Sequence, residues 1–435
     1  QHAAVEQENP EYLEAYQNLF LQWYAQRETI QRARPTNDVV FYELGLAGRS
    51  IRLINFLYTA MLLEAGDRIR PQTVEKLLKT YLGAARWLQL EQEEKGYREG
   101  NWQIFAIRFL LQFGILFPEF KEAEDFRSIA ATYIEAHLEK DFYADGGHSE
   151  RCFSYGSSIL RHIDECIQFT RSNPEIGTPQ SYDWTEKAKP IFEWYLKTVA
   201  PGPEFPGFGD GEFIRLTYPF TTAYALFDDP RFLWPIKHQS AKWAKLAVDP
   251  GYRSQILPSS EFCVLRDGFA PEATYLLINY GGFPGGHSHQ DLLDFTLYAQ
   301  GVPLAAEVGR FNGYDQPWDL YFRSPQAHNQ FTVEGAHMER EHYRGEEVRF
   351  ASTEKVECFS AIHKAYLKTA GIIMERRIVF LKNWGFLVFD TATKVDLQPE
   401  HALYQSARNS FLWHLHAPFP FQIDPESARV SADSA

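Results

Sequence analysis

The chain has 435 residues, of which 45% are hydrophobic and 15% aromatic, so it can build more than one packed core and two or three domains are expected. It carries 57 acidic against 43 basic side chains and a formal net charge of −14, which excludes a general electrostatic grip on nucleic acid. Its four cysteines are scattered and form no CxxC pair, so no dense disulfide framework is indicated. No apolar run reaches the roughly 20 residues that span a bilayer, and we expect no membrane insertion.

The first half of the chain is patterned for helices. From residue 10 to about 247, apolar side chains recur at three- and four-residue spacing. Helices are predicted at 10–30, 48–65, 72–93, 101–115, 122–140, 156–171, 185–199, 217–227 and 237–247. These are too many helices for one bundle, so the pattern predicts an (α/α) toroid, an incomplete barrel of antiparallel helix pairs.

At 249–260 the hydrophobic period changes from helical to two. Strands are predicted within 261–269, 273–282, 294–309, 329–335, 347–363, 372–395 and 409–419, with a hairpin turn at 383–385. We therefore expect an α+β multidomain chain, with a toroid domain at 1–248 and an antiparallel β-sheet or sandwich domain at 249–435. The run of strands stops abruptly near the end of the sequence, so we expect the β domain to be incomplete here.

Polar residues gather at three places in the helical half. Asn101 and Trp102 open a predicted helix, where Asn101 would serve as an N-cap or carry function. The turn at 142–158 is rich in glycine and concentrates polar and aromatic side chains, namely His148, Glu150, Arg151 and Tyr155. Asp210 lies in a long Gly/Pro loop at 201–212, a kind of loop that is often functional.

A fourth polar cluster begins at the glycine-rich stretch 281–291. If this stretch continues as a strand, alternation places His287, His289 and Asp291 on one face, so that two imidazoles share a site. Imidazole and carboxylate ligands suit Zn²⁺ or a similar divalent ion, for which His289, Glu307 and His328 would make a three-ligand set. Spacing alone leaves metal binding open. Arg310, Tyr314, Tyr321 and Arg323 follow in the same region.

These residue types fit β-elimination on a uronate better than hydrolysis. Hydrolysis of a glycoside normally requires two carboxylates that flank the bond, and Asp210 with Glu150 is the only pair we can nominate. Elimination instead requires donors that neutralise the uronate carboxylate, a base for the C5 proton and an acid for the departing O4. An amide, an imidazole and a phenol supply these three roles.

Three stretches resemble the heparinase II/III-like polysaccharide lyases, which include alginate, heparin and heparan sulfate lyases. They are DGGHSERCFSY at 145–155, GGHSHQDLLDFTLYAQGVPLAAEVG at 285–309 and YFRSPQAHNQFTVEG at 321–335. FGDG at 208–211 and FLWHLHAP at 411–418 agree more weakly. The similarity covers roughly residues 40 to 420, and the family's toroid followed by an antiparallel β-sheet domain matches the architecture expected from periodicity.

The resemblance implies a role for each matching residue. Tyr155 falls on the catalytic tyrosine, an acid that also acts as base for one uronate stereochemistry, and His287 falls on a candidate base for the other. Asn101 falls on the asparagine that neutralises the substrate carboxylate. His289, Glu307 and His328 fall on the positions of a mainly structural metal, and no organic cofactor is expected. The remaining expected substrate-binding residues are Trp102, His148, Glu150, Arg151, Asp210, Arg310, Tyr314 and Arg323, with the three arginines as a basic lining for a polyanion.

Three positions depart from the family pattern. Trp102 stands where some members have a histidine, Gly156 replaces the histidine after the catalytic tyrosine, and Glu307 replaces the usual aspartate. The predicted activity is cleavage of a uronate-containing polysaccharide, either a glycosaminoglycan or alginate. The alternatives are a glycoside hydrolase on an α/α toroid and a non-catalytic polysaccharide-binding protein, because the departures at 102 and 156 are also compatible with lost activity. We expect a secreted or periplasmic protein whose signal peptide is not visible in this chain.

Overall fold

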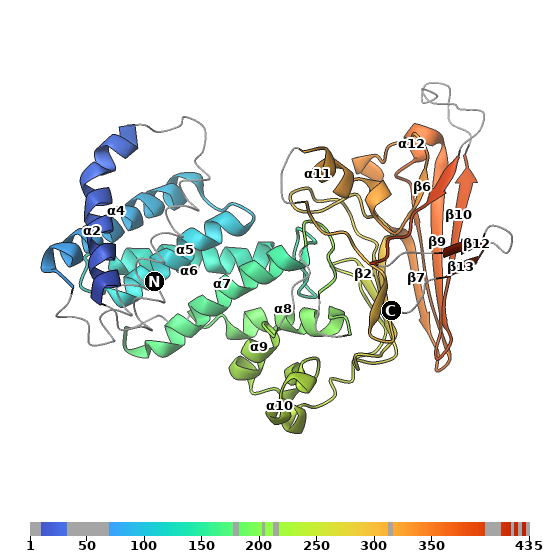
Figure 1. Ribbon diagram of the computed structural model, residues 1–435, viewed down its shortest axis with the longest axis horizontal. Helices are drawn as coiled ribbons and strands as arrows, with labels where there is room; N and C mark the ends of the chain where they lie inside the picture. The colour runs from blue at the N-terminus through green and yellow to red at the C-terminus, as the bar shows by residue number, and fades with distance from the viewer. Residues whose placement is uncertain are drawn as a thin grey trace. The chain divides into compact units, whose positions relative to one another are not determined.

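The computed structural model describes residues 10–32, 69–176, 182–201, 205–211, 217–311, 316–395, 410–418, 422–424 and 429–431. The first part of the chain is helical, and the second part is built from antiparallel strands (Figure 1). Among the described residues, none of the helices is both long and apolar enough for a bilayer crossing. The expected change from a helical to a strand pattern is therefore confirmed.

The long helices follow the predicted segments within a few residues. They are α2 (Pro10–Arg32), α4 (Pro71–Lys95), α5 (Asn101–Leu116), α6 (Ala123–Lys140), α7 (Phe153–Ser172), α8 (Thr185–Thr198), α9 (Phe220–Phe227) and α10 (Ala241–Leu246). In α4, the fully buried Leu77, Tyr81, Ala85 and Leu88 share one face, and they follow the three- and four-residue spacing that predicted the helix. The predicted helix at 48–65 lies outside the described residues.

Shorter helical turns connect the larger elements. They are η2 (Pro174–Ile176), η4 (Pro230–Leu233), η5 (Lys237–Gln239), α11 (Pro317–Phe322), η6 (Pro325–Ala327), η7 (Arg340–His342) and α12 (Leu367–Ala370). The sequence pattern did not predict α11 or α12, because a helix of four to six residues is too short to show a hydrophobic period.

Two antiparallel sheets make up most of the strand region. One has the order β1 (Gln255–Leu257), β2 (Phe262–Arg266), β3 (Tyr275–Asn279), β4 (Phe295–Ala299) and β5 (Val302–Ala305). The other has the order β10 (Gly385–Lys394), β9 (Ile372–Leu381), β8 (Val356–His363) and β7 (Glu346–Ser352). Two small pairs complete the described strands, β6 (Phe331–Val333) with β11 (Phe411–Trp413) and β12 (Gln422–Asp424) with β13 (Arg429–Ser431).

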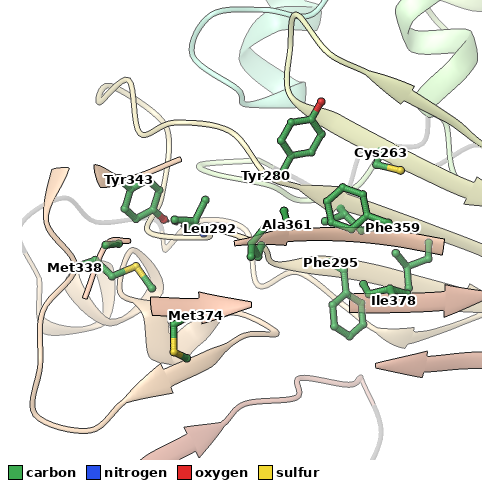
Figure 2. Close-up of a cluster of buried hydrophobic side chains, with 14 of the residues drawn as sticks. Cys263, Tyr280, Leu292, Phe295, Met338, Tyr343, Phe359, Ala361, Met374 and Ile378 are labelled. Atoms are coloured by element: carbon green, nitrogen blue, oxygen red, sulfur yellow. Dashed lines mark hydrogen bonds between the residues drawn. The ribbon is translucent and has the colours of Figure 1, made fainter. Parts of the chain in front are cut away.

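A single buried cluster joins the two larger sheets. Cys263 on β2 and Phe295 on β4 contribute to the same core as Phe359 on β8 and Ile378 on β9 (Figure 2). Burial alternates along β8 and β9, so one face of that sheet points into the core, as in a β-sandwich. The predicted hairpin turn joins β9 and β10, with Asn383 at φ +67°.

The described chain divides into two compact units. One comprises Gln1–Asp141 with Ile159–Thr185, and the other comprises Phe142–Ser158 with Glu186–Ala435. The change from helices to strands falls between α10 and β1, close to the predicted boundary. The domain bounds of 1–248 and 249–435 stay a prediction. The second unit contains the 142–158 turn, the 205–211 loop and the strand region, so the polar residues of these three segments belong to one unit.

Candidate active site

The histidine-rich loop is a series of turns and not a strand. Residues 285–287 form a bend and turn before β4, with Gly285 and Gly286 at φ +91° and +58°. Such positive φ angles are easily adopted only by glycine, which explains part of the glycine run. The expectation that strand alternation brings His287, His289 and Asp291 to one face is therefore wrong, although the two imidazoles do share a partner.

That partner is Asp210, in the loop before α9. His287 Nδ1 lies 2.8 Å from Asp210 Oδ2, and His289 Nε2 lies 2.9 Å from Oδ1. The backbone N–H of Asp210 also donates to the His287 carbonyl at 2.8 Å. The loop can approach this closely because position 209 is glycine: a Cβ there would lie 2.4 Å from the His287 carbonyl oxygen. Asp210 was predicted to bind substrate, but it is only 1% exposed, and its contacts position the two histidines.

Arg323 completes the set of donors around this carboxylate. Its Nη2 donates to Asp210 Oδ2, and its Nη1 donates to the carbonyl of Gly286 at 3.2 Å. Burial on its own would raise the pKa of Asp210, but the hydrogen bonds from His287 and His289 and the charge of Arg323 lower it well below its ordinary value. The carboxylate is therefore ionised and holds three cationic or donor groups in place. Arg323 keeps its expected position beside the site.

Tyr155 and His287 lie face to face. Their ring centroids are 3.4 Å apart with an interplanar angle of 15°, so the phenol and the imidazole form one aromatic pair. Arg310 Nη1 approaches the Tyr155 hydroxyl oxygen at 3.4 Å. The His287 side chain is 20% exposed, so the pair is reachable from solvent while its supporting carboxylate is not. The structure thus brings together three predicted site residues, Tyr155, His287 and Arg310.

The hydrogen bond to Asp210 selects one tautomer of His287. Because a carboxylate only accepts, Nδ1 carries a proton, and in the neutral imidazole the lone pair is therefore on Nε2. The same reasoning assigns the proton of His289 to Nε2 and the lone pair to Nδ1. Burial lowers the pKa of His289, so its neutral form is favoured.

A candidate metal group lies behind this pair. Asp294, Glu307 and His328, which we call the buried triad, are 0–2% exposed and offer ligand atoms within 4.8 Å of one another. Burial and the neighbouring Asp294 raise the pKa of Glu307 well above its ordinary value. Nε2 of His328 is buried without a hydrogen-bond partner. An oxygen-rich set with one imidazole suits a divalent ion, so the residues fit the expected metal.

The composition of this group differs from the predicted ligand set. Glu307 and His328 were predicted, but Asp294 joins them in place of His289, whose Nε2 is bonded to Asp210. His289 remains adjacent, with its ring centroid 5.4 Å from that of His328 and its Nδ1 buried without a hydrogen-bond partner. The sequence signal for Asp294 was its place three residues after Asp291, directly before β4.

Arg151 has a structural role, which corrects its expected contact with substrate. It is 4% exposed, and its guanidinium donates to the carbonyls of Ser260 and Glu261 and to the side chain of Asn279. A Cβ at Gly281 would lie 2.0 Å from the Arg151 Cζ atom. Arg151 therefore ties the 142–158 turn to the start of the first sheet, and its burial keeps the guanidinium away from a polyanion.

His148 and Glu150 come from the same turn as Tyr155. His148 is 5% exposed, packs edge-on against Phe142 at 5.2 Å and accepts a hydrogen bond at Nδ1 from the Glu150 backbone N–H. Glu150 is partly buried, and its Oε1 lies 3.4 Å from the position of a Cβ on Gly286. Burial argues against substrate contact for His148, whereas Glu150 remains a candidate.

Gly156 has no room for the histidine found in the family pattern. A Cβ at this position would lie 2.8 Å from the Cβ of His148 and 2.9 Å from the hydroxyl of Tyr195. The departure at 156 is therefore accommodated by packing around the turn, and it leaves the Tyr155–His287 pair in place.

Two predicted residues belong to the first unit. Asn101 is the first residue of α5 and Gly100 is its N-cap residue, so the prediction that Asn101 caps the helix is wrong. Trp102 is 45% exposed, as a stacking surface requires. Their roles toward substrate stay predictions. Tyr314 lies outside the described residues.

Comparisons with known proteins agree with this fold. The model of the heparinase II/III N-terminus matches residues 3–233, and that of the heparinase II/III-like C-terminal region matches residues 249–434. The heparin-sulfate lyase of Pedobacter heparinus is 22% identical over 331 residues, covering 74% of this chain and 48% of that protein. The heparin-sulfate lyase of Bacteroides stercoris is 21% identical, covering 56% and 37%. The chain thus spans about half the length, or less, of these curated relatives.

Solved structures show the same fold. A crystal structure of heparinase III superposes with a TM-score of 0.73 at 16% identity, covering 89% of this chain and 60% of that one. The heparan sulfate lyase from Pedobacter heparinus gives a TM-score of 0.62 at 20% identity, covering 86% and 58%. These likenesses confirm the predicted fold class, a helical toroid followed by antiparallel β-sheets. The family's N-terminal model alone matches more than half of the residues of this chain, so the chain belongs to the heparinase II/III family.

Proposed function

We propose that the protein is a lyase that cleaves a glycosaminoglycan by β-elimination. The single observation that carries this proposal is the stacked Tyr155–His287 pair, with its imidazole fixed by the buried carboxylate of Asp210. An elimination site needs a base and an acid close together, and it needs neither a second catalytic carboxylate nor an activated water. The stacked pair offers both groups within one solvent-accessible position.

His287 is the proposed base for one uronate stereochemistry. Its Nδ1–H bond to Asp210 leaves Nε2 with the lone pair that would accept the C5 proton. When the imidazole takes that proton it becomes a cation, and the adjacent carboxylate of Asp210 stabilises the new charge. Asp210 is thus a positioning residue that acts through His287.

Tyr155 is the proposed acid. Its hydroxyl would protonate the O4 oxygen as the glycosidic bond breaks, which leaves a phenolate. Arg310, at 3.4 Å from this oxygen, places a positive charge where the negative charge develops. For the other uronate stereochemistry, Tyr155 would act as both base and acid. Asn101 is the proposed donor to the substrate carboxylate, a role that rests on the family resemblance.

The buried triad would hold the divalent ion of the family. A cation there would neutralise two carboxyl groups that otherwise repel and would fix the loop before β4. His289, whose ring centroid lies 5.4 Å from that of His328, shares Asp210 with His287. The ion's proposed contribution is therefore to hold the framework, while proton transfer is assigned to Tyr155 and His287.

The contacts of Asp210 disfavour the hydrolase alternative. That reading needs Asp210 and Glu150 as an acid and a base across the scissile bond. Both oxygens of Asp210 already accept hydrogen bonds from His287, His289 and Arg323, and the residue is 1% exposed. A carboxylate so engaged cannot approach a sugar. A non-catalytic binding protein is the remaining alternative, and turnover separates it from a lyase.

The test is ultraviolet absorbance of the 4,5-unsaturated uronate product on a panel of polymers. We expect heparan sulfate to be cleaved, because two curated relatives are named heparin-sulfate lyases. Chondroitin sulfates, hyaluronan, alginate and pectate complete the panel. Tyr155→Phe and His287→Ala should both abolish the signal on a polymer whose stereochemistry uses both residues. Binding without absorbance on any polymer would favour the binding-protein alternative. The exported location expected for an enzyme with polymeric substrates is part of the proposal and can be tested by cell fractionation.

A further inference from the structure

The short helix α11 exposes three large apolar side chains beside the candidate active site. Trp318, Leu320 and Tyr321 are 60%, 64% and 39% exposed. Removing apolar side chains from water is favourable, so a cluster of this size in an exposed position is a candidate contact surface. Clusters of exposed aromatic residues commonly mark binding surfaces. Phe311, just before the preceding gap in the described residues, is a further exposed aromatic at 37%.

Another residue of α11 links this helix to the catalytic pair. Asp319 is 5% exposed and accepts a hydrogen bond from Arg323 Nε at 3.3 Å. Arg323 in turn donates to Asp210, the carboxylate that orients His287, and its carbonyl accepts from the backbone N–H of Gln290. The exposed face of α11 is therefore held at a fixed place relative to the proposed base.

Two of the exposed side chains form one surface. Trp318 and Tyr321 are three residues apart on the helix, so they lie on the same side, and their ring centroids are 5.9 Å apart at 89°. Leu320 lies two residues after Trp318, about 200° around the helix from it. Trp318 precedes Arg323 by five residues, about 7.5 Å along the helix axis. The aromatic surface is thus within the reach of a polysaccharide chain whose cleavage point lies at Tyr155 and His287.

Resting on the proposed function, we propose that Trp318 and Tyr321 form a sugar-binding subsite that holds an acidic polysaccharide next to the cleavage point. A pyranose ring has an apolar C–H face and a polar rim, which suits a stacking aromatic surface. Arg323 links α11 to the proposed base, because it binds the carboxylates of both Asp319 and Asp210. This continuity with the catalytic pair favours a substrate chain as the occupant.

The test compares three single variants of the full chain, Trp318→Ala, Tyr321→Ala and Leu320→Ala. Leu320 is the matched control because it is as exposed and apolar as Trp318 but has no stacking face. On the polymer that the wild type cleaves, we expect Trp318→Ala and Tyr321→Ala to raise KM about tenfold with kcat within about twofold of wild type. Leu320→Ala should leave both constants unchanged. On the shortest oligosaccharide that the wild type cleaves, the rise in KM should shrink.

Polymer affinity in a Tyr155→Phe background gives a readout independent of turnover. There, Trp318→Ala should weaken binding about tenfold in affinity electrophoresis. Equal effects of Trp318→Ala and Leu320→Ala, or no effect of either on a polymer that is cleaved, would overturn the subsite while leaving the lyase proposal intact. Light scattering measures the oligomeric state of the same variants: a wild type that is dimeric and a Trp318→Ala variant that is monomeric would overturn the subsite in favour of a second copy as occupant. Binding that depends on Trp318 without any turnover would support the subsite and refute the lyase.

Discussion

Replacing Asp210 by asparagine should separate the proposed catalytic geometry from a merely structural one. The substitution keeps the shape of the side chain but removes its charge and turns one acceptor into a donor. In the native protein, Oδ2 accepts from His287 and Arg323, and Oδ1 accepts from His289. We expect the amide oxygen to face the two donors at Oδ2, so that His287 keeps its tautomer and loses only the neighbouring charge.

The size of the effect follows from that charge. An imidazolium and a carboxylate separated by about 4 Å attract by about 4 kcal/mol at an effective dielectric constant of 20. Part of this attraction is lost to solvent, because the side chain of His287 is 20% exposed. A loss of about 3–4 kcal/mol in the transition state corresponds to a fall in kcat of roughly 100- to 1000-fold. Arg323 also loses one of its two carboxylate partners, so we expect the free energy of unfolding to fall by about 1–3 kcal/mol.

The assay is the initial rate of product absorbance, measured beside urea unfolding of the same preparation. Asp319→Asn is the matched control, because Asp319 is the other buried carboxylate that binds Arg323, at 3.3 Å, and it is not among the groups bonded to His287. We expect that control to lower stability while kcat stays within about threefold of wild type. A folded Asp210→Asn protein that also keeps its kcat within threefold would refute the role given to Asp210.

Three further outcomes are expected. Gly156→Ala should lower the free energy of unfolding by about 1–3 kcal/mol, because the new Cβ would lie 2.8 Å from the Cβ of His148. Gly83→Ala is the control and should cause no such loss, because a Cβ at position 83 has nothing within 4 Å. Urea unfolding compares the two variants, and equal stabilities would contradict the packing argument. Burial lowers the pKa of His162 and His363 to about 3, below the value of about 6.5 in the unfolded chain. The stability that their neutral forms contribute is therefore fully present above pH 6.5. As the pH falls toward 3, the free energy of unfolding decreases by up to about 1.4 kcal/mol per pH unit for each histidine. Unfolding at pH 7 and pH 5 measures this slope, which His363→Gln should reduce and which would be absent if these histidines were charged. A chelator should lower the melting temperature, and an added divalent ion should restore it. The ion should bind more tightly at higher pH, because the buried triad must release protons to bind it. Elemental analysis that finds no bound metal under saturating conditions would count against the metal site.

The sequence predicted the fold because its two hydrophobic periods are long and uninterrupted. The stripe of Leu77, Tyr81 and Leu88 and the alternation along β8 and β9 are local patterns, and burial in the structure follows them. The exceptions are elements set by tertiary contacts. The helix α11 is one turn and a half long, and its position depends on the hydrogen bonds of Arg323.

The sequence predicted those site residues that lie in recognisable motifs. It did not predict which residues from distant parts of the chain contact one another. Tyr155 and His287 follow from their motifs, but they are 132 positions apart, and no spacing rule places their rings in contact. Asp210 was identified as a loop residue, yet its role depends on contacts with residues 77, 79 and 113 positions away. The assignment of Arg151 failed for the same reason, because an arginine that binds backbone carbonyls cannot be told by sequence from one that faces a polyanion.

The central claim is elimination by the Tyr155–His287 pair, and the bond chemistry tests it directly. Heparan sulfate would be digested by the purified protein in water enriched in heavy oxygen, and the products analysed by mass spectrometry. Elimination adds no water, so the account predicts new chain ends with the mass of an unsaturated uronate and no heavy label, formed by the wild type and not by Tyr155→Phe. Products that carry heavy oxygen and a saturated end would show hydrolysis and contradict the account.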